Sequence, residues 1–184
     1  MRQFLLCTLL TGLVFAAVAC DSDKPESPLA YSDAKKMNDA VRSTLATEID
    51  NAKSTLSQGN EYTSGSGNGS LSITGTVTTT LAEETINTTI KLTNYMISIA
   101  GTEWETSGTV TFERTTQSAN DESTLRLGGS FTLSNILLKW NFRWNNLTIE
   151  NLLTDDDEGG KVWSTIYGGS FSINGFSFNY PNSN

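Results

Sequence analysis

Three kinds of side chain in this sequence could do chemistry: cysteine thiols, carboxylates and clustered aromatic rings. Histidine is absent from all 184 residues, and the two cysteines are Cys7 and Cys20. Without histidine, Ser–His–Asp and Cys–His catalysis are excluded, as is every histidine-ligated metal site.

The carboxylates form two groups. The acidic run Asp155-Asp156-Asp157-Glu158, followed by two glycines, offers oxygen ligands for calcium, with Asp155 and Asp157 as the candidates. The run lacks the spacing of an EF-hand loop, and solvated loop charge is the plainer interpretation. A second group could in principle supply the acid and base of a glycosidase: Glu83, Glu84, Glu103, Glu105 and Glu113. Nothing in the sequence brings two of these together, so we predict no enzyme and no cofactor.

The aromatic cluster is Trp140, Phe142 and Trp144, which fall on one face of an alternating segment. Two indoles four residues apart could form a platform on which a sugar stacks, or could line a cavity for an apolar ligand. The alternative is that alternating aromatic residues belong to the core. Both interpretations stay open at this point.

Cys20 ends a segment with the features of an export signal. Met1-Arg2 is followed by an apolar run from Phe4 to Val18, and Ala17-Val18-Ala19 precedes the cysteine. This run is shorter than the roughly 20 residues that a membrane-spanning helix needs. A short apolar run that ends in small residues is typical of a cleaved signal peptide. We therefore predict that residues 1–19 are removed.

The segment Ala17-Val18-Ala19-Cys20 resembles the lipobox of bacterial lipoprotein precursors, although leucine is usual where Ala17 stands. The resemblance implies that the Cys20 thiol receives a diacylglyceryl group and becomes the lipidated N-terminus. It also implies a location in the bacterial cell envelope and a membrane as partner. Ordinary secretion with a chance cysteine would give the same cleavage. Asp21 resembles the enteric signal for retention at the inner membrane, but the sequence leaves open which membrane carries the protein.

Composition and charge exclude some classes of function and indicate the class of fold. The formal net charge is −8, which repels phosphate backbones and argues against nucleic-acid binding. Charged residues make up 17% of the chain, and serine, threonine, asparagine and glycine replace much of the usual apolar content. A chain rich in threonine and isoleucine favours strands over helices.

The segment from Cys20 to residue 69 is expected to contain a tether, a helix and a linker. Residues 20–31 are polar and contain Pro25 and Pro28, so they are expected to form an extended tether behind the lipid. Residues 32–58 are expected to form an amphipathic helix with Ser32 as its N-cap. Its apolar stripe consists of Met37, Val41, Leu45, Ile49, Ala52 and Leu56. We expect this stripe to cover the protein's own sheet. A Gly/Ser linker is expected at 59–69.

Residues 70–184 alternate between apolar and polar side chains with the period of a β-strand. Leu71, Ile73, Val77 and Leu81 share one face, for example, and Leu138, Trp140, Phe142 and Trp144 share another. Glycines inside such segments indicate bulges or bends. We predict a mainly β fold in which an antiparallel meander forms a curved sheet, barrel-like or sandwich, with one N-terminal amphipathic helix.

Two functions fit these features. The first is a membrane-anchored envelope lipoprotein that binds or carries an apolar ligand. The second is a structural or adhesive surface protein without a ligand cavity, which displays its serine and threonine face to an envelope partner or glycan.

Overall fold

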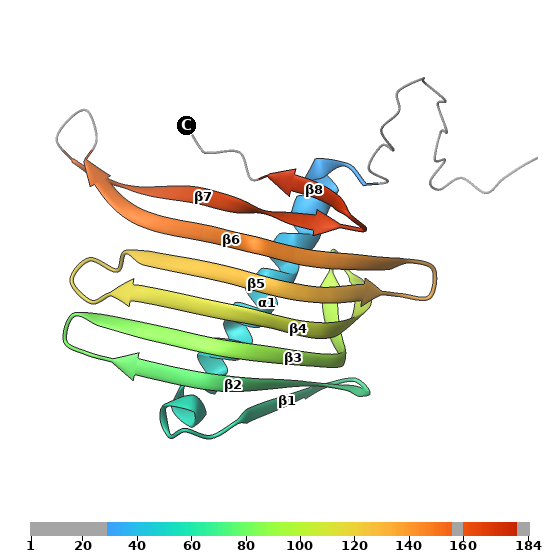
Figure 1. The fold of residues 1–184 in the computed structure, drawn as a ribbon, viewed down its shortest axis with the longest axis horizontal. Coiled ribbons are helices and arrows are strands. Elements are labelled where there is room, and N and C mark those ends of the chain that lie inside the picture. Colours follow the sequence, from blue (N-terminus) through green and yellow to red (C-terminus); the bar gives the residue numbers. More distant parts are fainter. Residues whose placement is uncertain (1–28, 156–159, 180–184) are drawn as a thin grey trace, which may run out of the picture.

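A computed structural model of the chain describes residues 29–155 and 160–179. One helix, α1 (Tyr31–Ser57), precedes eight strands. These strands are β1 Tyr62–Ser66, β2 Gly69–Thr79, β3 Glu83–Ile99, β4 Thr102–Gln117, β5 Ser123–Ser134, β6 Lys139–Asp155, β7 Lys161–Ile173 and β8 Phe176–Asn179. Figure 1 views the sheet with α1 behind it.

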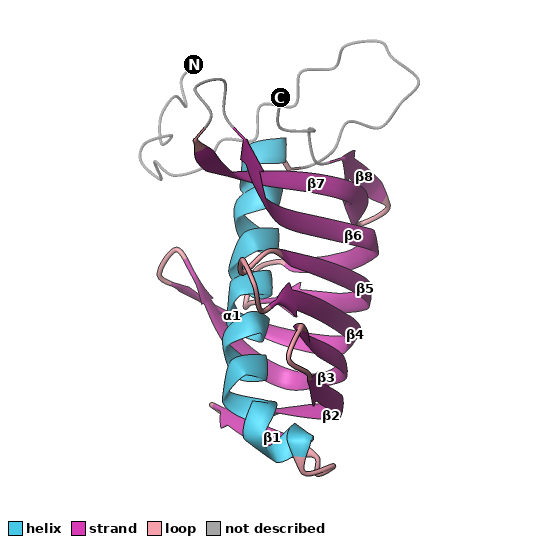
Figure 2. Ribbon diagram, turned by 90° about the vertical axis from the view of Figure 1, so that its left-hand side faces the viewer, coloured by secondary structure: helices cyan, strands magenta, loops and turns pink. Residues whose placement is uncertain are grey.

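The predicted fold class is confirmed, since the strands form one curved antiparallel meander. Each strand pairs with its neighbour in the sequence, in the order β1-β2-β3-β4-β5-β6-β7-β8. The sheet does not close, because β1 and β8 lie at opposite edges of that order. In place of a second sheet, α1 supplies the second layer and crosses one face of the strands (Figure 2).

The predicted helix is confirmed, and the apolar stripe named from its periodicity is buried in full. Its start differs from the prediction, because α1 begins at Tyr31 and Ala30 occupies the N-cap position without a side-chain cap. Ser32 therefore lies in the first turn. Leu29 packs against the core, although it falls within the expected tether.

The core lies between α1 and the sheet. Trp144 is 2% exposed, and its indole Nε1 donates a 2.6 Å hydrogen bond to Oδ1 of Asn38, a buried residue of α1. The Phe131 ring stacks on Phe142 at 5.1 Å and meets the edge of Trp144 at 5.0 Å. Such offset and edge contacts are the favoured arrangements of aromatic rings.

The C-terminal half of α1 is tied to β1–β4 by polar contacts. Glu48 accepts hydrogen bonds from the hydroxyls of Tyr95 at 2.8 Å and Tyr62 at 3.2 Å. Burial, followed by the hydrogen bond to Glu48, raises the pKa of Tyr95 to about 12. Arg114 forms a 2.7 Å ion pair with Asp50 of α1. The helix is thus fixed to the sheet along its length.

The predicted linker at 59–69 is only partly correct, because it contains β1. Residues Tyr62–Ser66 pair with Gly69–Ile73 of β2, and Gly67 takes a positive φ of 62° in the connecting turn. Tyr62 packs against the core. The Gly- and Ser-rich composition suits a tight hairpin as well as a flexible linker.

Mid-strand glycines allow the sheet to bend, as the sequence predicted. Gly129 has a φ of +100°, and a Cβ there would lie 2.5 Å from the Thr109 carbonyl oxygen. At Gly75 a Cβ would lie 2.0 Å from the Asn87 carbonyl oxygen. Irregular pairing also occurs within β3, β5 and β6, at 92–95, 127–129 and 145–148. Bulges of this kind increase local twist and bend.

Residues 1–28 lie outside the described residues, so the predicted signal peptide, Cys20 and most of the tether stay predictions. Within the described part of the chain, no helix is both long and apolar enough to cross a membrane.

Candidate functional site

The candidate site is the sheet face opposite α1, called here the open face. Alternation places apolar side chains under the helix and polar ones on the open face. The strand register then aligns threonines from neighbouring strands. Thr78, Thr85, Thr115 and Thr124 lie opposite one another on β2, β3, β4 and β5. We call this set the four-threonine row.

A second row lies four residues further along the strands. Thr74, Thr89 and Thr111 lie opposite one another on β2, β3 and β4, and form the three-threonine row. Neighbouring strands are about 4.8 Å apart, and side chains on one face repeat about every 6.7 Å along a strand. The hydroxyls are therefore presented as a regular grid.

A charged pair lies between the two rows. Asn87 lies opposite Glu113, which in turn lies opposite Arg126. A distance of 3.8 Å separates Glu113 Oε2 from Arg126 Nη1, and both side chains are about half exposed. Each charge thus has one partner and remains open to solvent. An exposed pair of this kind contributes little to stability, so both groups stay accessible to a ligand.

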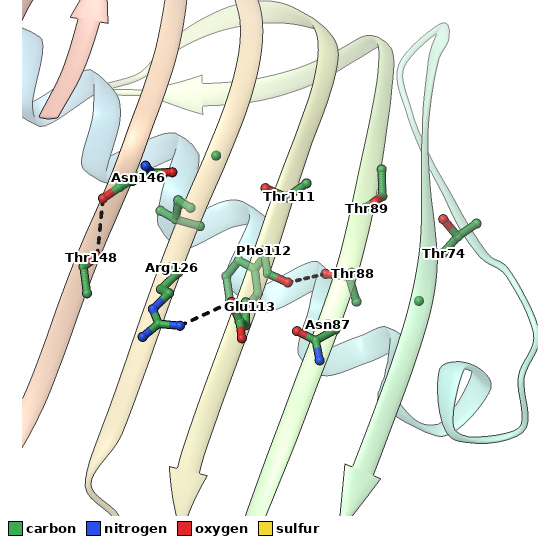
Figure 3. Close-up of a pocket in the computed structure, with 13 residues that line it drawn as sticks. Thr74, Asn87, Thr88, Thr89, Thr111, Phe112, Glu113, Arg126, Asn146 and Thr148 are labelled. Atoms are coloured by element: carbon green, nitrogen blue, oxygen red, sulfur yellow. Dashed lines mark hydrogen bonds and ion pairs between the residues drawn. The ribbon is translucent and has the colours of Figure 1, made fainter. Parts of the chain in front are cut away.

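The open face is hollowed over these strands. The hollow has a volume of about 600 Å³ and is lined from β2, β3, β4, β5 and β6 (Figure 3). Its polar lining side chains include those of Thr74, Asn87, Thr89, Thr111, Glu113, Arg126, Asn146 and Thr148. Asn146 lies in the β6 bulge and has a positive φ of 50°. The bend that the glycines and bulges permit thus coincides with the hollow.

Hydrogen bonding is the chemistry that this surface offers. Threonine hydroxyls donate and accept, the Asn87 amide does both, and the two charged groups add one strong acceptor and one strong donor. By the strand register, the aromatic side chains of the described strands lie on the helix side instead. Among the residues that the structure describes, the open face therefore has no ring on which a sugar could stack.

The aromatic cluster is placed in the core. Trp140, Phe142 and Trp144 are all buried on the helix side of β6. Their alternation reflects packing under α1, where Trp144 also meets Asn38. Of the two interpretations that the sequence allowed, the structure places these residues in the core.

The carboxylates are dispersed. Glu84 pairs with Lys53 of α1 at 2.7 Å, and the Glu83 carboxylate accepts a long hydrogen bond from Gln117. Glu103 and Glu105 lie at the far end of β4 from Glu113. Asp155 is the last residue of β6, and Asp157 lies outside the described residues. Among the described residues, no group of three or more potential ligands could hold a metal ion.

The threonine rows were missed by sequence reasoning, although one signal for them was present. Alternation places Ser70, Ser72, Thr74, Thr76 and Thr78 on a single face of β2. The rows themselves depend on the register of four strands, which alternation does not fix. No protein-family model matches the chain, and comparisons with curated proteins and with solved structures also found no significant match.

Proposed function

We propose that the chain is a lipid-anchored protein of the bacterial cell envelope that binds a polar, hydroxyl-rich ligand, such as an envelope glycan, on its open face. The anchor rests on Cys20 and the segment before it. The binding role rests on one observation, the polar hollow of about 600 Å³ that is lined by the three-threonine row and the Glu113–Arg126 pair.

The division of the sheet into two faces supports this role. The helix side is filled by aromatic and aliphatic side chains, including the cluster that could have lined an apolar cavity. Each hydroxyl on the open face could hydrogen-bond with water, so folding does not require these hydroxyls to lie in rows. A repeating polar surface suits a repeating polar ligand. This favours the adhesive alternative over the carrier of an apolar ligand.

The hollow offers hydrogen-bonding groups, so we expect a ligand to bind through many weak contacts along an extended chain. A single hydrogen bond to a ligand contributes about 0.5–1.5 kcal/mol net. Without aromatic stacking, tight binding must come from several hydrogen bonds along an extended chain. A polymer that crosses β2 to β6 could contact both threonine rows and the Glu113–Arg126 pair.

The binding role is tested with isosteric substitutions. Thr89→Val and Thr111→Val together remove two hydroxyls but keep the shape and strand preference of the side chains. The matched control is Thr63→Val, on the open face of β1 outside the hollow. Sedimentation with purified cell-wall polysaccharide would measure binding. We expect the double variant to bind roughly tenfold or more weakly, and equal binding by all three chains would refute the proposal.

The anchor has its own test. Mass spectrometry of the chain isolated from bacterial membranes should find an acylated cysteine at the N-terminus. Cys20→Ala should release the protein or leave it unprocessed, because burial of acyl chains contributes about 0.8 kcal/mol per methylene. Membrane retention of a Cys20→Ala chain from which residues 1–19 have been cleaved would contradict a lipid anchor at this residue.

A further inference from the structure

The turn between β5 and β6 exposes three consecutive aliphatic side chains, Ile136, Leu137 and Leu138. The first is fully exposed, Leu137 is 87% exposed and Leu138 is 45% exposed. The sequence pattern had grouped Leu138 with the core-facing residues that follow it. Isolated apolar side chains are common on surfaces, but three in one turn form a concentrated apolar tip.

This tip is held in a defined shape. The Asn135 side-chain Oδ1 accepts hydrogen bonds from the backbone N–H groups of Leu137 at 2.9 Å and Leu138 at 2.8 Å. The Asn135 N–H donates to the Leu138 carbonyl at 2.9 Å. Glycine, asparagine and aspartate usually occupy the centre of such turns. Isoleucine and leucine do not stabilise such a turn, so folding alone does not explain why these side chains are exposed.

The surroundings of the tip combine apolar and charged groups. A hollow of about 550 Å³ adjoins the turn and is lined by Ile136, Leu137 and Met96 together with Glu103 and Glu105. Lys139 follows directly as the first residue of β6. The tip is thus an apolar point framed by charges of both signs.

The tip lies at the same end of the sheet as the start of α1. The Tyr31 ring lies 6.2 Å from Phe178 of β8, and β8 follows the turn at Asn174. Asn174 in turn is hydrogen-bonded to Asn141, through its backbone N–H at 2.8 Å and its side chain at 2.9 Å. Asn141 lies only four residues after Leu137, or about 13 Å along a strand. Figure 1 shows the β5–β6 turn and the N-terminal end of α1 on its right-hand side.

We propose that the Ile136–Leu138 tip inserts into the surface of the lipid bilayer that carries the anchor. This inference rests on the proposed lipid at Cys20. The nine residue steps from Cys20 to Leu29 can span at most roughly 30 Å, so a lipid at Cys20 holds Leu29 within that distance of the bilayer. A lipid at Cys20 keeps the tip at a high local concentration beside the bilayer. A small apolar contact is then enough to hold the tip in the bilayer surface.

A bilayer suits this tip better than a second copy of the chain or a protein partner. Stable protein interfaces bury about 800 Å² on each partner, far more than three aliphatic side chains provide. The opposite end of the strands is more acidic, because β6 ends at Asp155 and three further acidic residues follow it in the sequence, whereas two, Glu103 and Glu105, lie beside the tip. With the tip in the bilayer, the strands stand away from the membrane and the open face stays accessible to a ligand.

The test measures which end of the sheet meets lipid. Chain that begins at Cys20 has no other cysteine, so its thiol can be coupled to a maleimide lipid in phosphatidylcholine vesicles. Brominated acyl chains in these vesicles quench tryptophan fluorescence on contact. The variant Leu137→Trp places a reporter in the tip. The matched control is Leu81→Trp, because Leu81 is equally exposed in the β2–β3 turn at the opposite end.

We expect brominated vesicles to reduce the emission of the Leu137→Trp chain and to leave that of the Leu81→Trp chain unchanged. Absence of quenching in Leu137→Trp, or quenching in Leu81→Trp, would overturn the inference. Wild-type chain sets the baseline for both variants, because the chain has four tryptophans of its own. One of them, Trp140, lies two residues beyond Leu138 in β6, so quenching of each variant is measured relative to wild type.

Chemical coupling separates this result from the proposed anchor. The vesicle experiment attaches the chain at Cys20 whether or not a bacterium acylates it. Quenching of Leu137→Trp together with an unmodified Cys20 in bacterial membranes would refute the anchor alone. An acylated Cys20 without quenching of Leu137→Trp would refute the docked tip alone.

Discussion

Asn38→Ala should destabilise the protein more than any other single polar substitution on α1. Asn38 is fully buried, and its Oδ1 accepts the 2.6 Å hydrogen bond from Trp144 Nε1. The two residues are 106 positions apart in the sequence. Their contact is therefore a direct link between the first element of the fold and β6.

The magnitude follows from two terms. Truncation leaves the indole N–H buried without this acceptor, which costs about 1–3 kcal/mol. The removed amide leaves about 25 Å³ of space, which at about 24 cal/mol per Å³ adds about 0.6 kcal/mol. The sum is about 2–4 kcal/mol of unfolding free energy. In a domain of this size, that corresponds to a decrease in Tm of about 4–16 °C.

Urea denaturation followed by tryptophan fluorescence and circular dichroism would measure this loss. Asn51→Ala is the matched control, because Asn51 is an exposed asparagine of the same helix. In a double-mutant cycle with Trp144→Phe, we expect a coupling of about 1–3 kcal/mol, since the phenyl ring has no N–H to leave unsatisfied. An Asn38→Ala chain as stable as Asn51→Ala would refute the argument that this buried hydrogen bond stabilises the helix–sheet packing.

Four further substitutions test the fold. Gly129→Ala should destabilise the chain by about 2–4 kcal/mol, because its Cβ would meet the Thr109 carbonyl oxygen at 2.5 Å. Gly101 has a φ of +80° and open space around it. Gly101→Ala should therefore lower the free energy of unfolding by only about 1 kcal/mol. Because burial and Glu48 raise the pKa of Tyr95 to about 12, the folded state holds the phenol proton more tightly than the unfolded chain does. Stability should therefore decline above pH 10 and through pH 12, and urea titrations should show a shallower decline for Tyr95→Phe. Burial opposes ionisation of Asp50, but the hydrogen bond and charge of Arg114 outweigh it and lower the pKa of Asp50. That contribution is present above the ordinary carboxyl pKa and is lost as the pH falls below it, so Arg114→Met should reduce the acid sensitivity of the urea midpoint.

The sequence predicted the helix and the alternation of the strands well, because burial of one face imposes a period on each. The stripe from Met37 to Leu56 is buried in full for this reason. Alternation was less reliable where strands end. Leu81 and Leu138 continue the apolar pattern of their strands, yet both lie in exposed turns. Periodicity records which face a side chain takes, and it does not record where pairing stops.

The candidate site was harder to predict than the fold. Trp140 and Trp144 resembled a ligand platform, but the same spacing follows from packing beneath α1. Thr85, Thr115 and Thr124 come from three strands, and only the pairing register aligns them. That register is set by turns and bulges such as the one at Asn146, whose effects are not local. Function on a sheet face is a property of pairing, which single strands do not reveal.

The diagonal position of α1 has a consequence for how the chain folds. The sheet is built from neighbours in sequence, so hairpins can form early and add strands one after another. The helix is different, because it is synthesised first and its N-terminal half is covered by β6 and β8. Until those last strands are in place, Asn38 lacks its hydrogen bond to Trp144 and Tyr31 lacks its contact with Phe178. The final step of folding therefore packs α1, the first element, against the last strands. A chain shortened at its C-terminus should leave apolar side chains at the N-terminal end of α1 exposed, and should aggregate more readily.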